Sequence, residues 1–191
     1  VDAKGTVVTT AEAVAQCGRI TIDHDSDATI LAQDSASGVA ILTPVAPLAP
    51  SAYARFQSGA ARMGDAITVA GYSYEGRLPA PVLSFGSFEE PQGLNGEPGM
   101  ARLSVPVLPG DAGGPVLDES GAVLGMLLPT DVKGAKLLPD GVAFATSAAV
   151  ISAALTAAGV TPAQSDHAAR ATPDALNAAG LGMTVLVSCW D

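Results

Sequence analysis

Charged and aromatic residues are scarce in this 191-residue chain. Charged side chains make up 15% of it and aromatic side chains 4%, whereas roughly 25% of a typical soluble domain is charged. Nine residues are Lys or Arg and 19 are Asp or Glu, which gives a formal net charge of −10. Without a basic patch, nucleic acid and anionic membrane surfaces are not expected as partners.

Long apolar runs are also missing. The mean hydropathy is +0.35, yet no run reaches the roughly 18 residues that a membrane span needs. The longest candidate, Ala148 to Val160, is short and rich in Ala, which predicts a buried amphipathic helix. No signal peptide is visible where Val1 is followed by Asp2 and Lys4, so a leader was either removed or lies upstream.

Residues that bind metals are few. The two cysteines, Cys17 and Cys189, have no CxxC spacing and no nearby His, which argues against a metal site. A disulfide between them would fit an oxidising compartment, and two free buried thiols are the alternative. The acidic residues Asp23, Asp25 and Asp27 are spaced like half of a calcium loop, but the Gly and the distal Glu of that loop are absent. No metal and no cofactor are therefore expected.

Turn residues, in contrast, are abundant, with 21 glycines and 14 prolines. Short apolar or β-branched runs recur every 8 to 15 positions, which is typical of β-sandwiches and barrels. A Pro-rich connector at residues 44–50 separates two groups of such runs. The expected strands are 6–9, 19–23, 28–34 and 38–44 before it, and 66–72, 81–88, 100–105, 114–118, 122–130 and 141–146 after it.

The C-terminal part of the chain, in contrast, is predicted to contain two helices. Ser147 is expected to cap a helix that runs to about Ala158 and stops at Gly159. Residues 161–170 are expected to form a loop, and residues 172–179 a short helix with Pro at its first position. A last strand is predicted from residue 183 to residue 190.

One string of residues is highly specific: Gly110-Asp111-Ala112-Gly113-Gly114-Pro115-Val116. It resembles the GDSGGP motif of trypsin-like serine proteases, with Ala at the position of the nucleophilic Ser. In such a loop the glycines allow two N–H groups to point at one spot and hold an oxyanion. The resemblance covers roughly residues 5–159 and is closest to short bacterial trypsin-like domains.

The other two positions of the catalytic triad are altered as well. The run from Val7 to Val14 resembles the family's segment that carries the catalytic His, and Glu12 stands at that position. The run Val39-Ala40-Ile41-Leu42 resembles the one that follows the catalytic Asp, and Gly38 stands at that position. Since Ala112 offers no nucleophilic atom, we expect no catalytic residue here and interpret the chain as a pseudoenzyme.

Two histidines and one aspartate are the remaining candidates for a catalytic role. His24 reads as part of a hairpin turn and His167 lies in the polar tail, so both are expected to be solvated loop residues. Asp34 is four residues before Gly38 and is a candidate for a displaced acid if the alignment is shifted. Even then the site would lack a nucleophile.

The resemblance implies an all-β fold, a trypsin-like double six-stranded β-barrel with a C-terminal helix, here with an extra C-terminal strand. Residues 1–50 would form the first lobe, which lacks its first strands, residues 51–146 the second lobe, and residues 147–191 a helix and tail that pack back on the first lobe. It also implies an oxyanion-hole-like loop at Gly110, Asp111 and Ala112. The pocket-lining residues would be Pro106, Val107, Leu108, Pro109, Phe144, Ala145 and Thr146.

This interpretation predicts a protein- or peptide-binding, structural subunit of a larger assembly in the bacterial cell envelope, periplasmic or secreted. Its partner would be a protein or an extended peptide, with a membrane-associated complex among the candidates. The alternatives are a serine endopeptidase inactivated by engineering, a hydrolase with an unrecognised mechanism, and a regulator that competes with active proteases for peptides.

Overall fold

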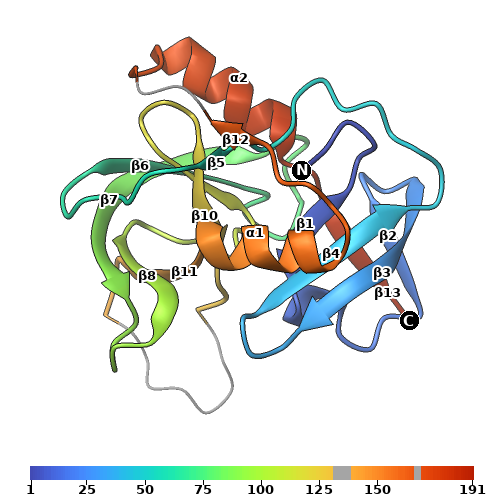
Figure 1. Ribbon diagram of the computed structural model, residues 1–191. Helices are drawn as coiled ribbons and strands as arrows, with labels where there is room; N and C mark the ends of the chain where they lie inside the picture. Colours follow the sequence, from blue (N-terminus) through green and yellow to red (C-terminus); the bar gives the residue numbers. More distant parts are fainter. Residues whose placement is uncertain (131–138, 166–168) are drawn as a thin grey trace.

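A computed structural model describes residues 1–130, 139–165 and 169–191. Two β-sheets dominate it, and the Pro-rich stretch at residues 45–50 between them contains neither strand nor helix (Figure 1). The first sheet has the order β1-β4-β3-β2-β13, with every neighbouring pair antiparallel. Its strands are β1 (Val7–Thr10), β2 (Arg19–Ile22), β3 (Ser26–Asp34), β4 (Val39–Pro44) and β13 (Val187–Trp190).

The second sheet contains a closed barrel. Strands β11-β8-β7-β6-β9-β10 follow one another, and a β10–β11 pairing closes the ring, while β5 and β12 extend the sheet beyond β10. The side chains of Ile67, Leu103 and Leu127 are almost fully buried inside it. The strands are β5 (Phe56–Gln57), β6 (Ala66–Gly71), β7 (Val82–Gln92), β8 (Pro98–Ser104), β9 (Pro115–Leu117), β10 (Val123–Leu127), β11 (Val142–Ser147) and β12 (Gln164–Ser165).

Helix α1 (Ala148–Ala157) ties the two sheets together. The Ser147 hydroxyl caps it by accepting a hydrogen bond from the Val150 N–H at 3.4 Å, as a Ser before an apolar run predicts. Its buried residues Ile151 and Leu155 belong to one apolar cluster with residues of both sheets, Ile41 among them. Figure 1 shows α1 lying across the junction between β10 and β4.

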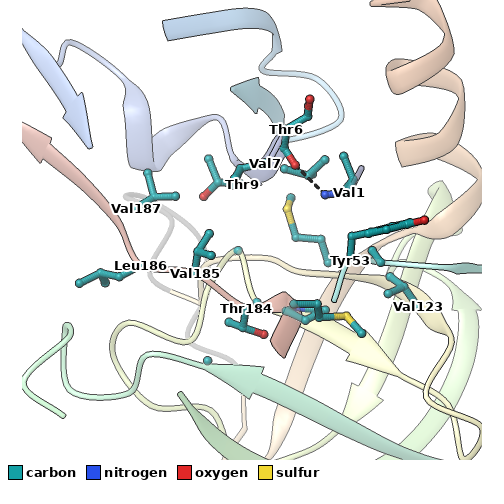
Figure 2. Close-up of a pocket in the computed structure, with 18 of the residues that line it drawn as sticks. Val1, Thr6, Val7, Thr9, Tyr53, Val123, Thr184, Val185, Leu186 and Val187 are labelled. Atoms are coloured by element: carbon teal, nitrogen blue, oxygen red, sulfur yellow. Dashed lines mark hydrogen bonds between the residues drawn. The ribbon is translucent and has the colours of Figure 1, made fainter. Parts of the chain in front are cut away.

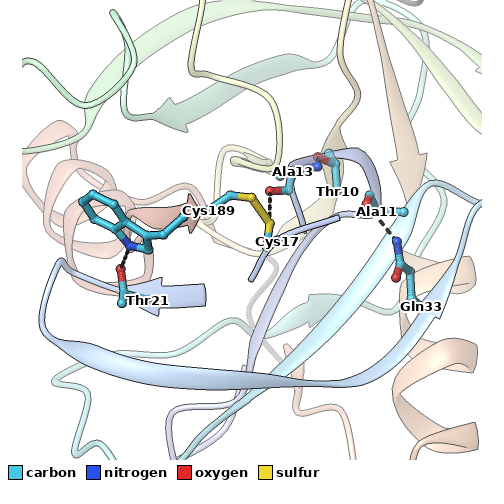
Figure 3. Close-up of a disulfide and its surroundings, with 8 residues drawn as sticks. Thr10, Ala11, Ala13, Cys17, Thr21, Gln33 and Cys189 are labelled. Carbon is cyan, nitrogen blue, oxygen red and sulfur yellow. Dashed lines mark hydrogen bonds between the residues drawn. A yellow bond between two sulfur atoms is a disulfide. The ribbon is translucent and has the colours of Figure 1, made fainter. Parts of the chain in front are cut away.

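The tail contacts both sheets. Helix α2 (Pro173–Met183) begins after the Thr172 cap and packs on β6 and β7. The chain then crosses to the first sheet, where β13 pairs with β2, and a disulfide joins Cys17 to Cys189 with their Cα atoms 5.3 Å apart (Figure 3). The Trp190 indole N–H donates to the Thr21 hydroxyl at 3.0 Å beside it.

These elements confirm the trypsin-like architecture, the C-terminal helix, the extra strand and the disulfide. All ten strands expected before residue 147 are present. Three predictions in the tail were wrong in detail: the second helix runs to Met183 rather than Ala179, the last strand starts at Val187 rather than Met183, and the expected loop 161–170 contains the short strand β12. Strand β5 was not predicted.

None of the helices in the described part of the chain has the length and apolar character that a membrane crossing requires.

Candidate active site and interlobe cavity

The loop at residues 110–114 is built around a buried carboxylate. The Asp111 side chain is 2% exposed. One of its oxygens accepts a hydrogen bond from the Ser73 hydroxyl at 2.6 Å, and the other accepts from the Leu108 N–H at 2.9 Å. These two bonds offset the cost of burying the carboxylate and fix the loop against the segment that follows β6.

Gly110 is required by the close packing of this loop. Its φ is +93°, a left-handed conformation, and a Cβ atom there would lie 2.4 Å from the Tyr72 carbonyl oxygen and 2.7 Å from the Glu75 nitrogen. Any side chain would therefore push the loop away from the Tyr72–Gly76 turn.

Two N–H groups of the loop are free of internal acceptors. Within residues 1–130, 139–165 and 169–191, neither the Gly110 N–H nor the Ala112 N–H donates a hydrogen bond, whereas the Asp111, Gly113 and Gly114 N–H groups all do. Gly110 is exposed and Ala112 is partly buried. Both N–H groups can therefore serve a carbonyl oxygen or an anion.

The structure brings together the segments that carry Glu12, Gly38 and Ala112, the residues that the resemblance assigns to the triad positions. Glu12 begins the single-turn helix η1 (Glu12–Val14) directly after β1, and its side chain is exposed. The Ala11 N–H donates to the Gly38 carbonyl oxygen at 2.9 Å, which fixes Gly38 beside this helix. A Cβ on Gly113 would lie 2.9 Å from the Thr9 hydroxyl, so the loop with Ala112 meets the end of β1.

An apolar side chain lies beside Gly38. Gly38 has a φ of +71°, and a Cβ there would lie 3.0 Å from Cδ2 of Leu128. The preceding carbonyl, that of Ser37, accepts a hydrogen bond from the Thr146 hydroxyl at 2.8 Å. Gly38 is thus held by its backbone, and an apolar methyl group occupies the space beside it.

Asp34, the candidate for a displaced acid, uses its carboxylate locally. It accepts hydrogen bonds from the Ser37 hydroxyl at 2.6 Å, the Ala36 N–H at 3.0 Å and the Ser37 N–H at 3.2 Å. The Ser37 hydroxyl first, and then the two N–H groups, hold the pKa of Asp34 below its usual range. This carboxylate stabilises the β3–β4 turn, and its hydrogen bonds all lie within that turn.

The sequence predicts that both histidines are loop residues. His24 is in the turn between β2 and β3 with a φ of +72°. His167 lies outside the described residues. Among the residues that the structure describes, no three His, Cys, Asp or Glu side chains gather in a way that could hold a metal ion.

The expected pocket-lining residues lie in two places. Residues 106–109 connect β8 to the Gly110 loop, where Val107 packs against the core of the closed barrel and Leu108 is 36% exposed. Phe144, Ala145 and Thr146 lie on β11, with Ala145 and Thr146 buried.

A cavity of about 170 Å³ lies elsewhere, on the inner side of the 110–114 loop. It is lined by Ala112 and its neighbours, by β1, by Tyr53 and by residues 182–187 of the tail (Figure 2). No acidic or basic side chain lines it. Sequence reasoning missed this cavity because its walls come from segments far apart in the chain.

The phenol of Tyr72 lies between this cavity and the β2–β3 turn. Burial, and then the Asp23 carboxylate, raise the pKa of Tyr72 above its ordinary value. Asp23 also accepts a hydrogen bond from the Leu186 N–H at 2.9 Å, which fastens the tail at this point.

A closed β-barrel packed through a helix on a second antiparallel sheet is the architecture of the trypsin-like class of proteins. A family model described as the trypsin-like peptidase domain matches residues 1–126. The chain belongs to this family.

Individual relatives are distant. An uncharacterized protein, y4bJ of Sinorhizobium fredii, is 25% identical over 196 aligned positions, which cover 97% of this chain and 31% of that protein. The chain thus spans about a third of the length of this curated relative.

Solved structures of proteases share the fold. The serine endoprotease from Yersinia pestis superimposes with a TM-score of 0.66 at 17% identity, over 83% of this chain and 55% of that one. The Rv3671c protease from M. tuberculosis, in its active form, superimposes with a TM-score of 0.65 at 23% identity, over 86% of this chain and 74% of that one. At these identities the likeness concerns the fold.

Proposed function

We propose that this domain is a catalytically inactive member of the trypsin-like family that binds a protein or an extended peptide without cleaving it. The observation that carries the proposal is the pair of free N–H groups on Gly110 and Ala112 beside a position that has no nucleophile. The donors that a substrate carbonyl needs are retained, while the atom that would attack this carbonyl is missing.

The other two triad positions support the same interpretation. A serine mechanism needs a base that takes the proton and a carboxylate that orients the base. Glu12 has no nucleophile to deprotonate, and Gly38 has no side chain. Three unlike substitutions at three positions fit a natural pseudoenzyme better than a single engineered knockout.

Binding of an extended segment would use main-chain hydrogen bonds. A ligand carbonyl would accept from the Gly110 and Ala112 N–H groups, and the ligand backbone would add to a strand edge of the cleft. Residues 106–109 and 144–146 would line its side-chain pocket. Since residues 106–109 are all uncharged, small apolar ligand side chains are favoured there.

We also propose that the domain works outside the cytoplasm as a subunit of a larger assembly in the cell envelope. The disulfide between Cys17 and Cys189 fits an oxidising compartment. The low content of charged residues is consistent with a surface that is partly covered by a partner.

The deciding experiment treats the purified protein with a fluorophosphonate probe and, separately, with a panel of fluorescent peptides. We expect no covalent label at any concentration that labels an active relative, together with saturable peptide binding and no cleavage products. Specific labelling, or turnover of a bound peptide, would overturn the pseudoenzyme proposal. Binding that displaces substrate from an active protease would favour a competing regulator instead.

A further inference from the structure

The first sheet, unlike the second, is open. Its five strands follow the order β1-β4-β3-β2-β13, and no pairing joins β1 to β13 in the described part of the chain. Because every neighbouring pair is antiparallel, the two outer strands β1 and β13 run in the same direction. One further strand that runs opposite to both would pair antiparallel with each of them and close a six-stranded barrel.

The outer edge of each of these two strands presents free main-chain groups. The Ala11 N–H donates to the carbonyl oxygen just before β4 at 2.9 Å, so the alternation along a strand turns the Val8 N–H and C=O away from β4. The Asp23 N–H donates to the Leu186 carbonyl oxygen at 2.9 Å, so the Val187 N–H and C=O point away from β2. Within the described residues, neither Val8 nor Val187 makes a main-chain hydrogen bond on its outer side.

The cavity of about 170 Å³ is lined by both of these edges. Figure 2 shows Val7 of β1 and, from the tail, Val185 and Val187 around it. All three side chains are only partly buried where they pack against the core of the first sheet. The gap between β1 and β13 therefore leaves apolar surface as well as hydrogen-bonding groups uncovered.

We propose that the gap between β1 and β13 receives a β-strand donated by a partner protein, which completes the barrel of the first lobe. The donated strand would run opposite to β1 and β13 and exchange main-chain hydrogen bonds with Val8 on one side and Val187 on the other. The proposal goes beyond the proposed function, because it concerns the edges of the first sheet rather than the Gly110 and Ala112 N–H groups.

The walls of the gap specify the chemistry of this strand. Both β1 and β13 are four residues long, which sets the length that can pair. One face of the strand would meet Val7 and Val187 at the core of the first sheet, and the other face would meet Val8 and Met183 at the cluster shared by the two sheets. No acidic or basic side chain lines the cavity. The fitting strand is thus an uncharged run that is apolar on both faces.

A second copy of this chain is a poorer donor than another protein. The apolar runs of the described residues already belong to strands and helices, and unpaired segments such as residues 45–50 and 105–109 contain prolines. Proline lacks the N–H that an inserted strand must offer to both of its neighbours.

The test uses the full chain labelled with ¹⁵N and the probe acetyl-Gln-Val-Ala-Val-Ala-Val-Gln amide. We expect saturable binding by calorimetry, and slower hydrogen exchange of the Val8 and Val187 amides in the complex, because each of them gains an acceptor. The same peptide with every second amide N-methylated loses donors and should bind at least about tenfold more weakly.

A pair of variants at one position tests the edge of β1. Val8→Pro removes the outward N–H at a place where an edge strand tolerates proline, and it should weaken binding of the probe by about tenfold or more. Val8→Ala keeps this N–H and is the matched control, for which we expect a loss of at most about threefold.

Absence of probe binding, or binding that leaves the exchange of the Val8 and Val187 amides unchanged, would overturn strand insertion. In the latter case, shifts of the Gly110 and Ala112 amides would still support the proposed function. Equal binding of the N-methylated peptide would also overturn strand insertion, and this comparison decides if Val8→Pro does not fold.

The oligomeric state of the protein alone tests the source of the strand. We expect a monomer at the concentrations of the binding experiment. Dimers that form as the concentration rises, and that protect the Val8 and Val187 amides, would identify a second copy as the occupant and refute a strand from a partner protein.

Discussion

Ser73 and Asp111 are 38 residues apart in sequence, and the hydroxyl of the first donates a 2.6 Å hydrogen bond to the buried carboxylate of the second. The bond joins the segment that follows β6 to the loop that carries Ala112. The shape of the site thus depends on a polar contact inside the closed-barrel lobe as well as on the glycines of the loop.

Ser73→Ala is expected to destabilise the fold by about 1–3 kcal/mol, because one oxygen of a buried carboxylate loses its donor. Urea denaturation measures the change. Ser58→Ala is the matched control, since Ser58 is exposed and its side chain has no hydrogen bond within the described residues. Equal midpoints for the two variants would show that the Asp111 carboxylate does not depend on Ser73.

The disulfide gives a second prediction. Cys17→Ser should lower the free energy of unfolding by about 2–5 kcal/mol, because the bridge closes a loop with a sequence separation of 172. Denaturation with and without a reductant checks it, and the reductant should have no further effect on the variant. A wild-type protein whose stability is insensitive to reduction would contradict the prediction.

Introducing His, Asp and Ser at the three proposed triad positions should give little reactivity, for a steric reason. We expect the triple variant Glu12→His, Gly38→Asp, Ala112→Ser to react poorly with a fluorophosphonate, since the new Asp meets Leu128 Cδ2 near 3.0 Å and must adopt a φ of +71°. Adding Leu128→Ala should raise the labelling rate by about tenfold or more, as the side chain gains room to orient the His.

The single variant Ala112→Ser serves as the control and should remain unlabelled. If the triple variant already labels as fast as the quadruple one, Leu128 is not the obstacle.

The low pKa of Asp34 predicts how the β3–β4 turn responds to acid. Because the folded-state pKa lies below the unfolded one, the carboxylate contributes stability above its unfolded pKa, and this contribution is lost as the pH falls through the folded pKa. NMR titration of the Asp34 carboxyl group should show the low value, and Ser37→Ala should raise it. An unchanged pKa in that variant would mean that the hydroxyl bond does not form in solution.

The strands and the loop at residues 110–114 were predictable because local sequence decides them. Turn residues bracket each apolar run, and the Gly-Asp-Ala-Gly-Gly-Pro string specifies a backbone that few other sequences can adopt. The Ser147 cap likewise acts on the N–H of a residue only three positions away.

The features that were not predicted from the sequence depend on tertiary contacts. The second helix was expected to end at Ala179, yet α2 continues through Gly180 to Met183. A Cβ on Gly180 would lie 2.8 Å from the Leu83 side chain. Glycine is needed at this position for close packing. Tyr74 and Glu75 carry no signal for a left-handed turn, since their conformation is imposed by the loop against which they pack.

The bond between Cys17 and Cys189 turns nearly the whole domain into a covalent ring. Cleavage of one peptide bond between these two residues would leave a single covalent molecule, heavier only by one water. The two pieces would separate only after the disulfide is reduced. Such a domain can be nicked in an exposed loop and still remain one covalently joined molecule.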